Sequence, residues 1–417
     1  MKKLFSIIAG VAVVAVLAGG NRANAADNNP AFDADYFESF KPSISQVRIP
    51  EPSAPEAVDK QGNSPEKSSG QDSVPVHGYT PQQKSMMDAN NDSLQKSFSL
   101  RRRLKLSKSP GQSDNEPAPV KYRPYADYEK PGYLIMSSGF NFESRQAKLE
   151  MAKNLPSDGV LVIFADNPSE SVKERILKDY ESVLPRSRIK VISLDGAGNG
   201  FWARDGIPVP VLDQGNKLTV VDAKYYHYFE PDSEISRIFK TGLEKHEYYF
   251  EGGNFQANHA GVCMIVNNER HAKIPDDIFS GQYGCKSLIR LPFVDGIGHV
   301  DERARFINEK TIVTDTPAYK DILEGKGFTV LLLPKPAKEY ETYVNSLIMN
   351  DHVVVPVFGE ATDAQALAVY EKLGLTASGG QSSSLSNNGQ GSIHCITMTY
   401  PKVPVTELMK ALGAKEL

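Results

Sequence analysis

The sequence is poor in cysteine and tryptophan and has no excess of positive charge. Its 417 residues include three cysteines and one tryptophan, and the formal net charge is −4 at pH 7. Three cysteines are too few for a disulfide scaffold, and no C-x-x-C pair indicates a zinc site. Because there is no basic surplus to neutralise phosphates, a nucleic-acid-binding protein is not expected. Long apolar runs are absent after the N-terminus, which argues against an integral membrane protein.

The N-terminal apolar run has the three parts of a secretory signal peptide. Lys2 and Lys3 precede an uncharged stretch of about 14 residues, and Ala23-Asn24-Ala25 fits the small-residue cleavage pattern. The run is shorter than the roughly 20 apolar residues that span a bilayer. We therefore expect residues 1–25 to be a cleaved signal peptide, and the mature protein to be periplasmic or secreted without a membrane span.

The segment 26–118 differs in composition from the rest of the chain. Proline, serine and other polar residues dominate it, and no apolar periodicity persists. Such a segment buries too little apolar surface to offset the entropy of ordering, so we expect it to be mostly disordered. The basic cluster 101–105 indicates either a processing site or a solvated linker. Whether the segment is a pro-segment, a linker or a tether stays open.

From about residue 119 the chain has the patterns of a globular α/β domain. Short apolar runs rich in β-branched residues alternate with amphipathic stretches of helical length. The expected strands are 133–136, 160–164, 188–192, 311–314 and 352–356, and the expected helices are 144–155, 169–183, 318–326 and 362–373. This alternation predicts an α/β fold for residues 119–417, although pattern alone does not say how the sheets close.

Four short clusters in this domain carry chemically active side chains. They read F-W-A-R-D at 201–205, E-G-G-N at 251–254, G-H-V-D at 298–301, and G-Q-G-S-I-H-C-I-T at 389–397. A cysteine together with a histidine indicates a thiolate nucleophile with an acid–base partner. In an extended segment, residues two apart point to the same side, so His299 and Asp301 share one face.

The carboxylates in these clusters indicate the substrate class. Several acids near a thiolate raise its pKa, so the set makes chemical sense only opposite a cation. A guanidinium is planar and permanently charged, and two carboxylates can hold its donors bidentately. Taken singly, each residue has a simpler interpretation: Cys395 as an inert buried thiol, His299 or His394 as structural, and Asp205 as a turn cap.

Taken together and in order, the four motifs resemble the agmatine deiminase and bacterial peptidylarginine deiminase family of guanidino-group-modifying enzymes. The resemblance covers about residues 122–401 and does not extend to the segment 26–118. It implies a five-bladed α/β propeller, the pentein fold, with the active site on the central axis. No internal repeat is visible in the sequence itself.

The resemblance also assigns roles to individual positions. It implies Cys395 as the nucleophile on the guanidinium carbon, and His299 as the acid that protonates leaving ammonia and then the base that activates water against a thiouronium intermediate. The other implied residues are Asp205 and Asp301, which hold the guanidinium nitrogens, Asn345 in the substrate site, and Trp202, Gly252 and Gly253, which shape the pocket. The mechanism needs no metal or other cofactor, and the D-x-D-x-D-G pattern of a calcium loop is absent.

The expected substrate follows from the expected compartment. Export favours peptidyl-arginine, converted to peptidyl-citrulline and ammonia, whereas agmatine hydrolysis for putrescine biosynthesis is the alternative. Relatives that prefer C-terminal arginine have an arginine pair after the first motif, but residues 222–230 contain none. Lys224 is a point charge that cannot reproduce a bidentate clamp, so we expect a weak preference for C-terminal arginine.

Two further points stay open at the level of sequence. Cys263 and Cys285 either form a disulfide, which leaves Cys395 as the free thiol, or remain two buried thiols. The other function classes are a guanidine-binding protein on a degenerate scaffold, a different cysteine hydrolase, and an amidinotransferase. The complete set of cysteine, histidine and carboxylates argues against the binding protein. A peptidase would not need paired carboxylates, and citrulline formed without chain cleavage would separate it from a deiminase. An amidinotransferase would release no ammonia unless its acceptor were absent.

Overall fold

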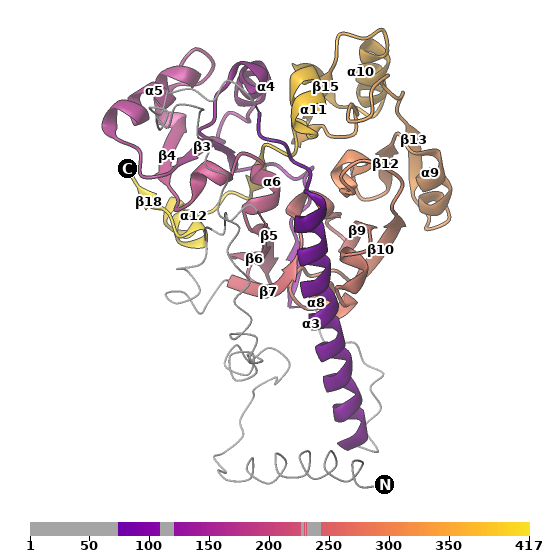
Figure 1. Cartoon of the computed structure of the whole chain (residues 1–417). Coiled ribbons are helices and arrows are strands. Elements are labelled where there is room, and N and C mark those ends of the chain that lie inside the picture. Colours follow the sequence, from indigo (N-terminus) through magenta and orange to yellow (C-terminus); the bar gives the residue numbers. More distant parts are fainter. Residues whose placement is uncertain (1–73, 109–120, 227–228, 230, 232–242) are drawn as a thin grey trace, which may run out of the picture. The chain divides into compact units, whose positions relative to one another are not determined.

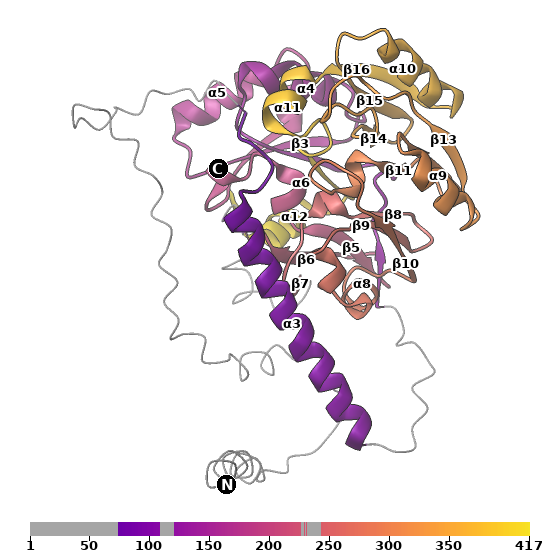
Figure 2. The same cartoon turned by 45° about the vertical axis from the view of Figure 1, so that its right-hand side comes forward.

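The computed structural model describes residues 74–108, 121–226, 229, 231 and 243–417 (Figures 1 and 2). Every described residue belongs to one compact unit of the chain, residues 69–417. The expected signal peptide and much of the segment 26–118 therefore lie outside the described residues. No helix in the described part is long and apolar enough to cross a membrane.

The described strands form five separate sheets. In sheet order, the first has β17 (Met398–Tyr400), β2 (Tyr133–Ser137), β3 (Val160–Ala165), β4 (Ile189–Ser193) and β18 (Lys415–Glu416), and the second has β1 (Tyr122–Pro124), β5 (Val209–Asp213), β6 (Leu218–Lys224) and β7 (Leu243–Tyr249). The three smaller sheets are β10 (Ser287–Pro292), β9 (Val262–Asn267) and β8 (Gln256–Ala257); β11 (Ala304–Phe306), β12 (Thr311–Thr314) and β13 (Thr329–Leu332); and β14 (Leu347–Met349), β15 (His352–Val357) and β16 (Thr376–Gln381).

The helices connect or flank these strands. They are α3 (Pro81–Lys108), α4 (Phe142–Lys153), α5 (Glu170–Tyr180), α6 (Ala203–Gly206), α8 (Asp276–Gly281), α9 (Pro317–Glu324), α10 (Thr362–Lys372), α11 (Ser383–Gly389) and α12 (Val405–Leu412). Five 3₁₀ turns are described as well: η2 (Arg186–Arg188), η3 (Ala197–Asn199), η4 (Gly252–Asn254), η5 (His271–Lys273) and η6 (Val300–Glu302). All strands and helices predicted from the sequence are present, with ends that differ by up to three residues.

The three small sheets share one pattern, which the sequence does not reveal. In each, a short strand pairs antiparallel with the next strand, and a helix then returns the chain to a parallel third strand. The helices are α8, α9 and α10 respectively. The three sheets repeat the same strand pairing but not the same residue types, because many different apolar sequences can form a strand at a given place in a sheet.

The core is formed on both faces of the parallel strands. In β3, Leu161 and Ile163 pack with the residues of α4 and α5, whereas Val162 and Phe164 face a second cluster that includes β5 and β6. Side chains of a strand alternate between its faces, so burial on both sides explains why β3 reads as one continuous apolar run.

Helix α3 lies inside the segment for which the sequence indicates disorder. Met87 is fully buried, and the Asn91 side chain both donates to the Tyr249 carbonyl oxygen (3.0 Å) and accepts from the Tyr249 N–H (2.8 Å). Figures 1 and 2 show α3 in indigo beside β7, which carries Tyr249. The expectation of disorder therefore does not hold for this helix, because tertiary contacts rather than an apolar stripe keep it ordered.

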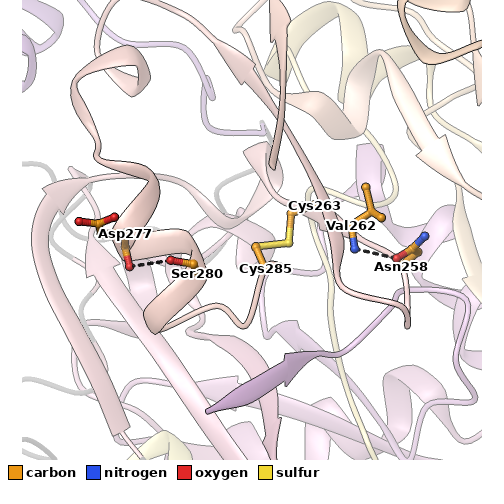
Figure 3. The surroundings of a disulfide bond; sticks show 6 residues. All are labelled: Asn258, Val262, Cys263, Asp277, Ser280 and Cys285. Carbon is orange, nitrogen blue, oxygen red and sulfur yellow. Dashed lines mark hydrogen bonds between the residues drawn. A yellow bond between two sulfur atoms is a disulfide. The ribbon is translucent and has the colours of Figure 1, made fainter. Parts of the chain in front are cut away.

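Of the two cysteine states left open by the sequence, the structure contains the disulfide. Cys263 in β9 and Cys285 just before β10 are bonded, with their Cα atoms 5.7 Å apart (Figure 3). The bond lies beside the turn in which Asn258 accepts a hydrogen bond from the Val262 N–H (2.9 Å). Cys395 is the free cysteine, and it is buried.

Candidate active site

The predicted site residues lie in the connections between successive sheets, and the structure brings them together. Five of these connections contribute: Trp202 and Asp205 between β4 and β5, Gly252 and Gly253 between β7 and β8, His299 and Asp301 between β10 and β11, Asn345 between β13 and β14, and Cys395 between β16 and β17. All eight are buried. Because loops and single helical turns carry these residues, their backbone is free of sheet pairing and can converge from five directions.

The thiol of Cys395 is held by a side-chain amide and a carboxylate. The Asn345 Nδ2 donates to the Cys395 Sγ at 3.2 Å, and the thiol faces the Asp301 Oδ2 at 3.6 Å. The Asn345 Oδ1 also accepts from the His394 N–H at 2.9 Å, which fixes the loop that carries the thiol. Asn345 therefore holds the Cys395 thiol with its amide nitrogen and the neighbouring backbone with its amide oxygen.

The thiol is protonated in the free protein. Burial raises the pKa of Cys395 well above its ordinary value, and the carboxylates of Asp301, Glu302 and Asp205 raise it further. A cation bound between these carboxylates offsets their charge and stabilises the thiolate. The thiolate of Cys395 is therefore favoured only when a cation lies beside these carboxylates.

His299 has the opposite electrostatic balance. Burial alone lowers its pKa, but the charges of Asp205, Glu251 and Asp301 outweigh burial and raise the pKa to about 9. Its Nδ1 lies 3.7 Å from the Asp205 Oδ1, and its Nε2 lies 3.7 Å from the Glu251 Oε2, so both nitrogens are near charges but beyond hydrogen-bond length. At neutral pH the ring is an imidazolium with protons to give.

Glu251 stabilises the charged form of His299, a role that the sequence motif did not reveal. Its carboxylate accepts hydrogen bonds from the Arg270 Nη2 (2.9 and 3.1 Å) and pairs with the His271 Nε2 (2.8 Å). Although burial opposes ionisation, these partners hold the pKa of Glu251 well below its ordinary value. The E-G-G-N motif marks the residue, but only the contacts show that it serves His299.

Asp301 is fixed through a chain of polar contacts that ends at Arg204. His394 Nδ1 lies 2.7 Å from the Asp301 Oδ2, and its Nε2 lies 2.8 Å from the Asp127 Oδ2. The Arg204 Nη1 donates to the Asp127 Oδ1 at 3.1 Å. His394 is therefore a positioning residue, and Asp127, which belongs to no motif, completes the chain.

The glycines of η4 leave room for the carboxylates. The Gly253 N–H donates to the Asp205 Oδ1 at 3.0 Å, and a Cβ on Gly253 would lie 2.7 Å from that oxygen and 2.9 Å from the His299 Nδ1. A Cβ on Gly252 would lie 2.2 Å from the Arg204 carbonyl oxygen. Any larger residue at either position therefore has to displace a neighbouring group of the site.

One further side chain reaches the site from outside the predicted domain. His77, which precedes α3, joins Asp205 and His299 in a buried group whose potential ligand atoms all lie within 4.8 Å of one another. Imidazole and carboxylate are ligands that Zn²⁺ accepts, so this trio could approach one metal ion. His77 belongs to no sequence motif.

The arrangement suits one kind of chemistry. Asp205 and Asp301 offer two carboxylates to a planar cation, Cys395 provides a nucleophile that ionises beside that cation, and His299 provides a proton for a leaving group. Together these residues can displace an amine from an amidine carbon.

Comparison with known proteins agrees with this chemistry. The family model described as Porphyromonas-type peptidyl-arginine deiminase matches residues 141–401. A Shewanella baltica protein provisionally named agmatine deiminase is 25% identical, over 55% of this chain and 80% of that protein.

Solved structures that are similar to this chain include two agmatine deiminases. The agmatine deiminase of C. jejuni has a TM-score of 0.55 at 22% identity, with 70% of this chain and 99% of that chain covered. An agmatine deiminase of Enterococcus faecalis has a TM-score of 0.53 at 18% identity, with 68% and 96% covered. These likenesses show that the chain has the α/β fold of the pentein type.

Proposed function

Because the chain belongs to the Porphyromonas-type peptidyl-arginine deiminase family, we propose that it is an exported enzyme that hydrolyses peptidyl-arginine to peptidyl-citrulline and ammonia. Its class is that of hydrolases that cleave guanidino C–N bonds. The observation that carries the proposal is the convergence of Cys395, His299, Asp205 and Asp301 in one buried site. The five described sheets are also the number that a five-bladed arrangement requires.

The first half of the reaction forms a covalent intermediate. Asp205 and Asp301 hold the guanidinium nitrogens, and the bound cation lowers the pKa of Cys395 so that its proton passes to solvent. The thiolate sulfur bonds to the guanidinium carbon, and the resulting tetrahedral centre expels one nitrogen as ammonia, protonated by His299. The product is a thiouronium on Cys395, with His299 left neutral.

The second half consumes one water molecule. Neutral His299 takes a proton from water as its oxygen bonds to the thiouronium carbon. The tetrahedral centre then collapses to a ureido group as the carbon–sulfur bond breaks, and the proton of its hydroxyl group passes to the departing sulfur, which restores the thiol of Cys395. Glu251 keeps His299 near the reacting atoms and stabilises its charged form, and Asn345 keeps the sulfur oriented throughout.

The choice of peptidyl-arginine rests on the signal peptide expected in residues 1–25, because an exported enzyme meets peptides rather than a cytosolic amine pool. The ion pairing of Lys224 bears on the form of that substrate. Its Nζ is paired with the Glu247 Oε2 at 2.9 Å, so its charge is already neutralised by a neighbour. A weak preference for C-terminal arginine is therefore still expected.

Agmatine is the second candidate substrate, and the names of the relatives favour it. The Shewanella baltica relative and the C. jejuni structure both bear the name agmatine deiminase. Agmatine presents the same guanidinium as arginine, so the four central side chains do not separate the two substrates. The difference lies in what surrounds the rest of the substrate.

The test measures ammonia and ureido product from three substrates: an internal-arginine peptide, a C-terminal-arginine peptide, and agmatine. Cys395→Ala protein serves as the blank. We expect turnover of both peptides at similar rates and little turnover of agmatine. Preferential turnover of agmatine would keep the chemistry and refute the substrate, whereas a peptide that ends in arginine reacting far faster than its amide would refute the argument from Lys224.

A further inference from the structure

The residues just before α3 fill the active site. The His77 side chain is buried, and its ring stacks on Trp202 with centroids 4.3 Å apart and planes 13° apart. The ring also meets His299 edge-on at 5.3 Å, and its Nε2 is hydrogen-bonded to the Asp205 carboxylate. An imidazole thus lies against three of the side chains assigned to substrate binding and catalysis.

The backbone around His77 is held in place by the walls of the site. The His77 N–H donates to the Gly389 carbonyl oxygen at 2.7 Å, and the Trp202 Nε1–H donates to the Pro75 carbonyl oxygen at 3.2 Å. Gly389 is the first residue of the motif that carries Cys395, and Trp202 belongs to the motif that carries Asp205. The segment therefore bridges two of the sequence motifs that build the site.

Residues on both sides of His77 donate hydrogen bonds to carboxylates. The Val74 N–H donates to the Glu143 Oε2 at 2.6 Å, and the Tyr79 hydroxyl donates to the Glu251 Oε1 at 2.6 Å. Glu251 is the residue that stabilises the charged form of His299. Residues 74–79, called the N-terminal segment from here on, thus engage the site at its rim and at its centre.

We propose that the N-terminal segment is an internal inhibitor, in which His77 takes the place of the substrate guanidinium. Resting on the function proposed above, this assignment follows from the chemistry of the contact: an imidazole is planar, carries N–H donors and can bear a positive charge, as a guanidinium does. It pairs with Asp205, one of the two carboxylates proposed to bind the substrate, and it covers the flat face of Trp202.

Substrate and segment exclude one another. A Cβ on Gly391 would lie 2.8 Å from the His77 Nδ1, and a Cβ on Gly78 would lie 2.4 Å from the Gln390 side-chain oxygen. The segment is therefore packed directly against the turn that leads to Cys395. Cys395, His299 and Asp301 are all fully buried, so the proposal requires that a reagent reaches the thiol faster when the segment is displaced.

The segment can leave without unfolding the rest of the chain. Its contacts are a few hydrogen bonds, the ring contacts of His77 and Tyr79, and the packing of the Val74 side chain in the core. Helix α3 has its own attachment through Met87 and through the Asn91 side-chain amide. A backbone rotation near Pro81 can therefore displace the N-terminal segment while α3 stays in place. Because only the open form binds substrate, the apparent affinity for substrate is reduced by the fraction of open molecules.

The test uses the rate at which iodoacetamide alkylates Cys395, the free thiol of the intact chain. The full-length protein is compared with His77→Ala at one pH and in the presence of EDTA, so that a metal ion held by the His77 trio cannot account for closure. We expect alkylation to be roughly ten- to hundredfold faster in His77→Ala, the effect of losing one hydrogen bond to a charged group and one ring stack. His259→Ala, which removes an exposed histidine, is the matched control and should behave as the wild type.

A second variant guards against a folding defect. Tyr79→Phe removes only the hydroxyl that donates to Glu251, and it should alkylate about tenfold faster than the wild type with an unchanged melting temperature. Rates equal to or below the wild type in both variants would overturn the proposal. So would a loss of deimination in His77→Ala at unchanged alkylation, because His77 would then assist catalysis.

Alkylation needs no substrate, so the outcome separates the two proposals. Faster alkylation with matching gains in deimination supports both. Faster alkylation without ureido product from any of the three substrates supports the internal inhibitor and refutes the deiminase. Full deimination by the wild type, unchanged in His77→Ala, supports the deiminase and refutes the inhibitor.

Discussion

Asp301→Asn should make Cys395 more reactive while it abolishes turnover. In the wild type the Asp301 carboxylate lies 3.6 Å from the Cys395 sulfur, and it is the first charge, after burial, that raises the pKa of the thiol. Asparagine keeps an oxygen that can accept from His394 but removes the negative charge. Two readouts should therefore move in opposite directions, which a general disruption of the site does not produce.

The size of the effect can be estimated from the distance. At an effective dielectric constant of about 20, a unit charge 3.6 Å away contributes at most about 4.6 kcal/mol, or about 3 pKa units. Neighbouring charges shift pKa values in proteins by about 1 to 3 units. Each unit gives about tenfold more thiolate but about threefold lower intrinsic nucleophilicity, so alkylation should become roughly 3- to 30-fold faster.

The assay measures second-order alkylation of Cys395 by iodoacetamide at pH 7.5 or so, with deimination followed in parallel. Asp321→Asn, which removes an exposed carboxylate on α9, is the matched control. Alkylation of Asp301→Asn at or below the wild-type rate would refute the argument that this carboxylate holds the thiol protonated. Retained deimination would refute its role in holding the guanidinium.

Three further predictions follow from other parts of the structure. Burial lowers the pKa of Lys148 to about 7, so between about pH 7 and 10 the unfolded chain binds a proton at this residue that the folded protein does not. Stability in this range should therefore rise with pH. In urea unfolding, the free energy of unfolding of the wild type relative to Lys148→Met should increase by about 1.4 kcal/mol per pH unit. Gly253→Ala should lose deimination roughly hundredfold or more, because the new Cβ meets the Asp205 and His299 side chains, whereas Gly198→Ala, where a Cβ meets no atom within 4 Å, should keep it. Replacing both Cys263 and Cys285 by alanine should lower the unfolding free energy by about 3 kcal/mol in urea and leave native alkylation of Cys395 unchanged.

The secondary structure of the domain could be predicted because it depends on local pattern. Strand β3 is a continuous apolar run and β12 consists of β-branched residues, and their ends in the structure agree with the expectation to within one residue. The grouping of strands into five sheets could not be predicted, because pairing joins distant residues such as Met398 and Ile135. Helix α3 was missed for a related reason: one buried methionine and one paired asparagine order it, and neither produces a helical apolar stripe.

The proximity of the candidate site residues could be predicted, because the four motifs carry the chemical groups that deimination would use; their catalytic roles stay predictions. A thiol, an acid–base histidine and two carboxylates have few substitutes, so motifs preserve them in order. Supporting residues are less constrained. Asp127 holds His394 through one carboxylate oxygen, and nothing in the neighbouring sequence sets it apart from any other acid.

The contact between the N-terminal segment and the site could not be predicted from the sequence. Its fit to the site depends on one imidazole and on backbone groups, including the Pro75 carbonyl and the His77 N–H, which every peptide of similar length offers. Many sequences could therefore block this site, and none would share a recognisable motif. The region that matches the family, residues 141–401, specifies the chemistry, but it does not specify whether the site is open. That state is set by residues outside the family region, so relatives with the same motifs can differ in latency without any change in their catalytic residues.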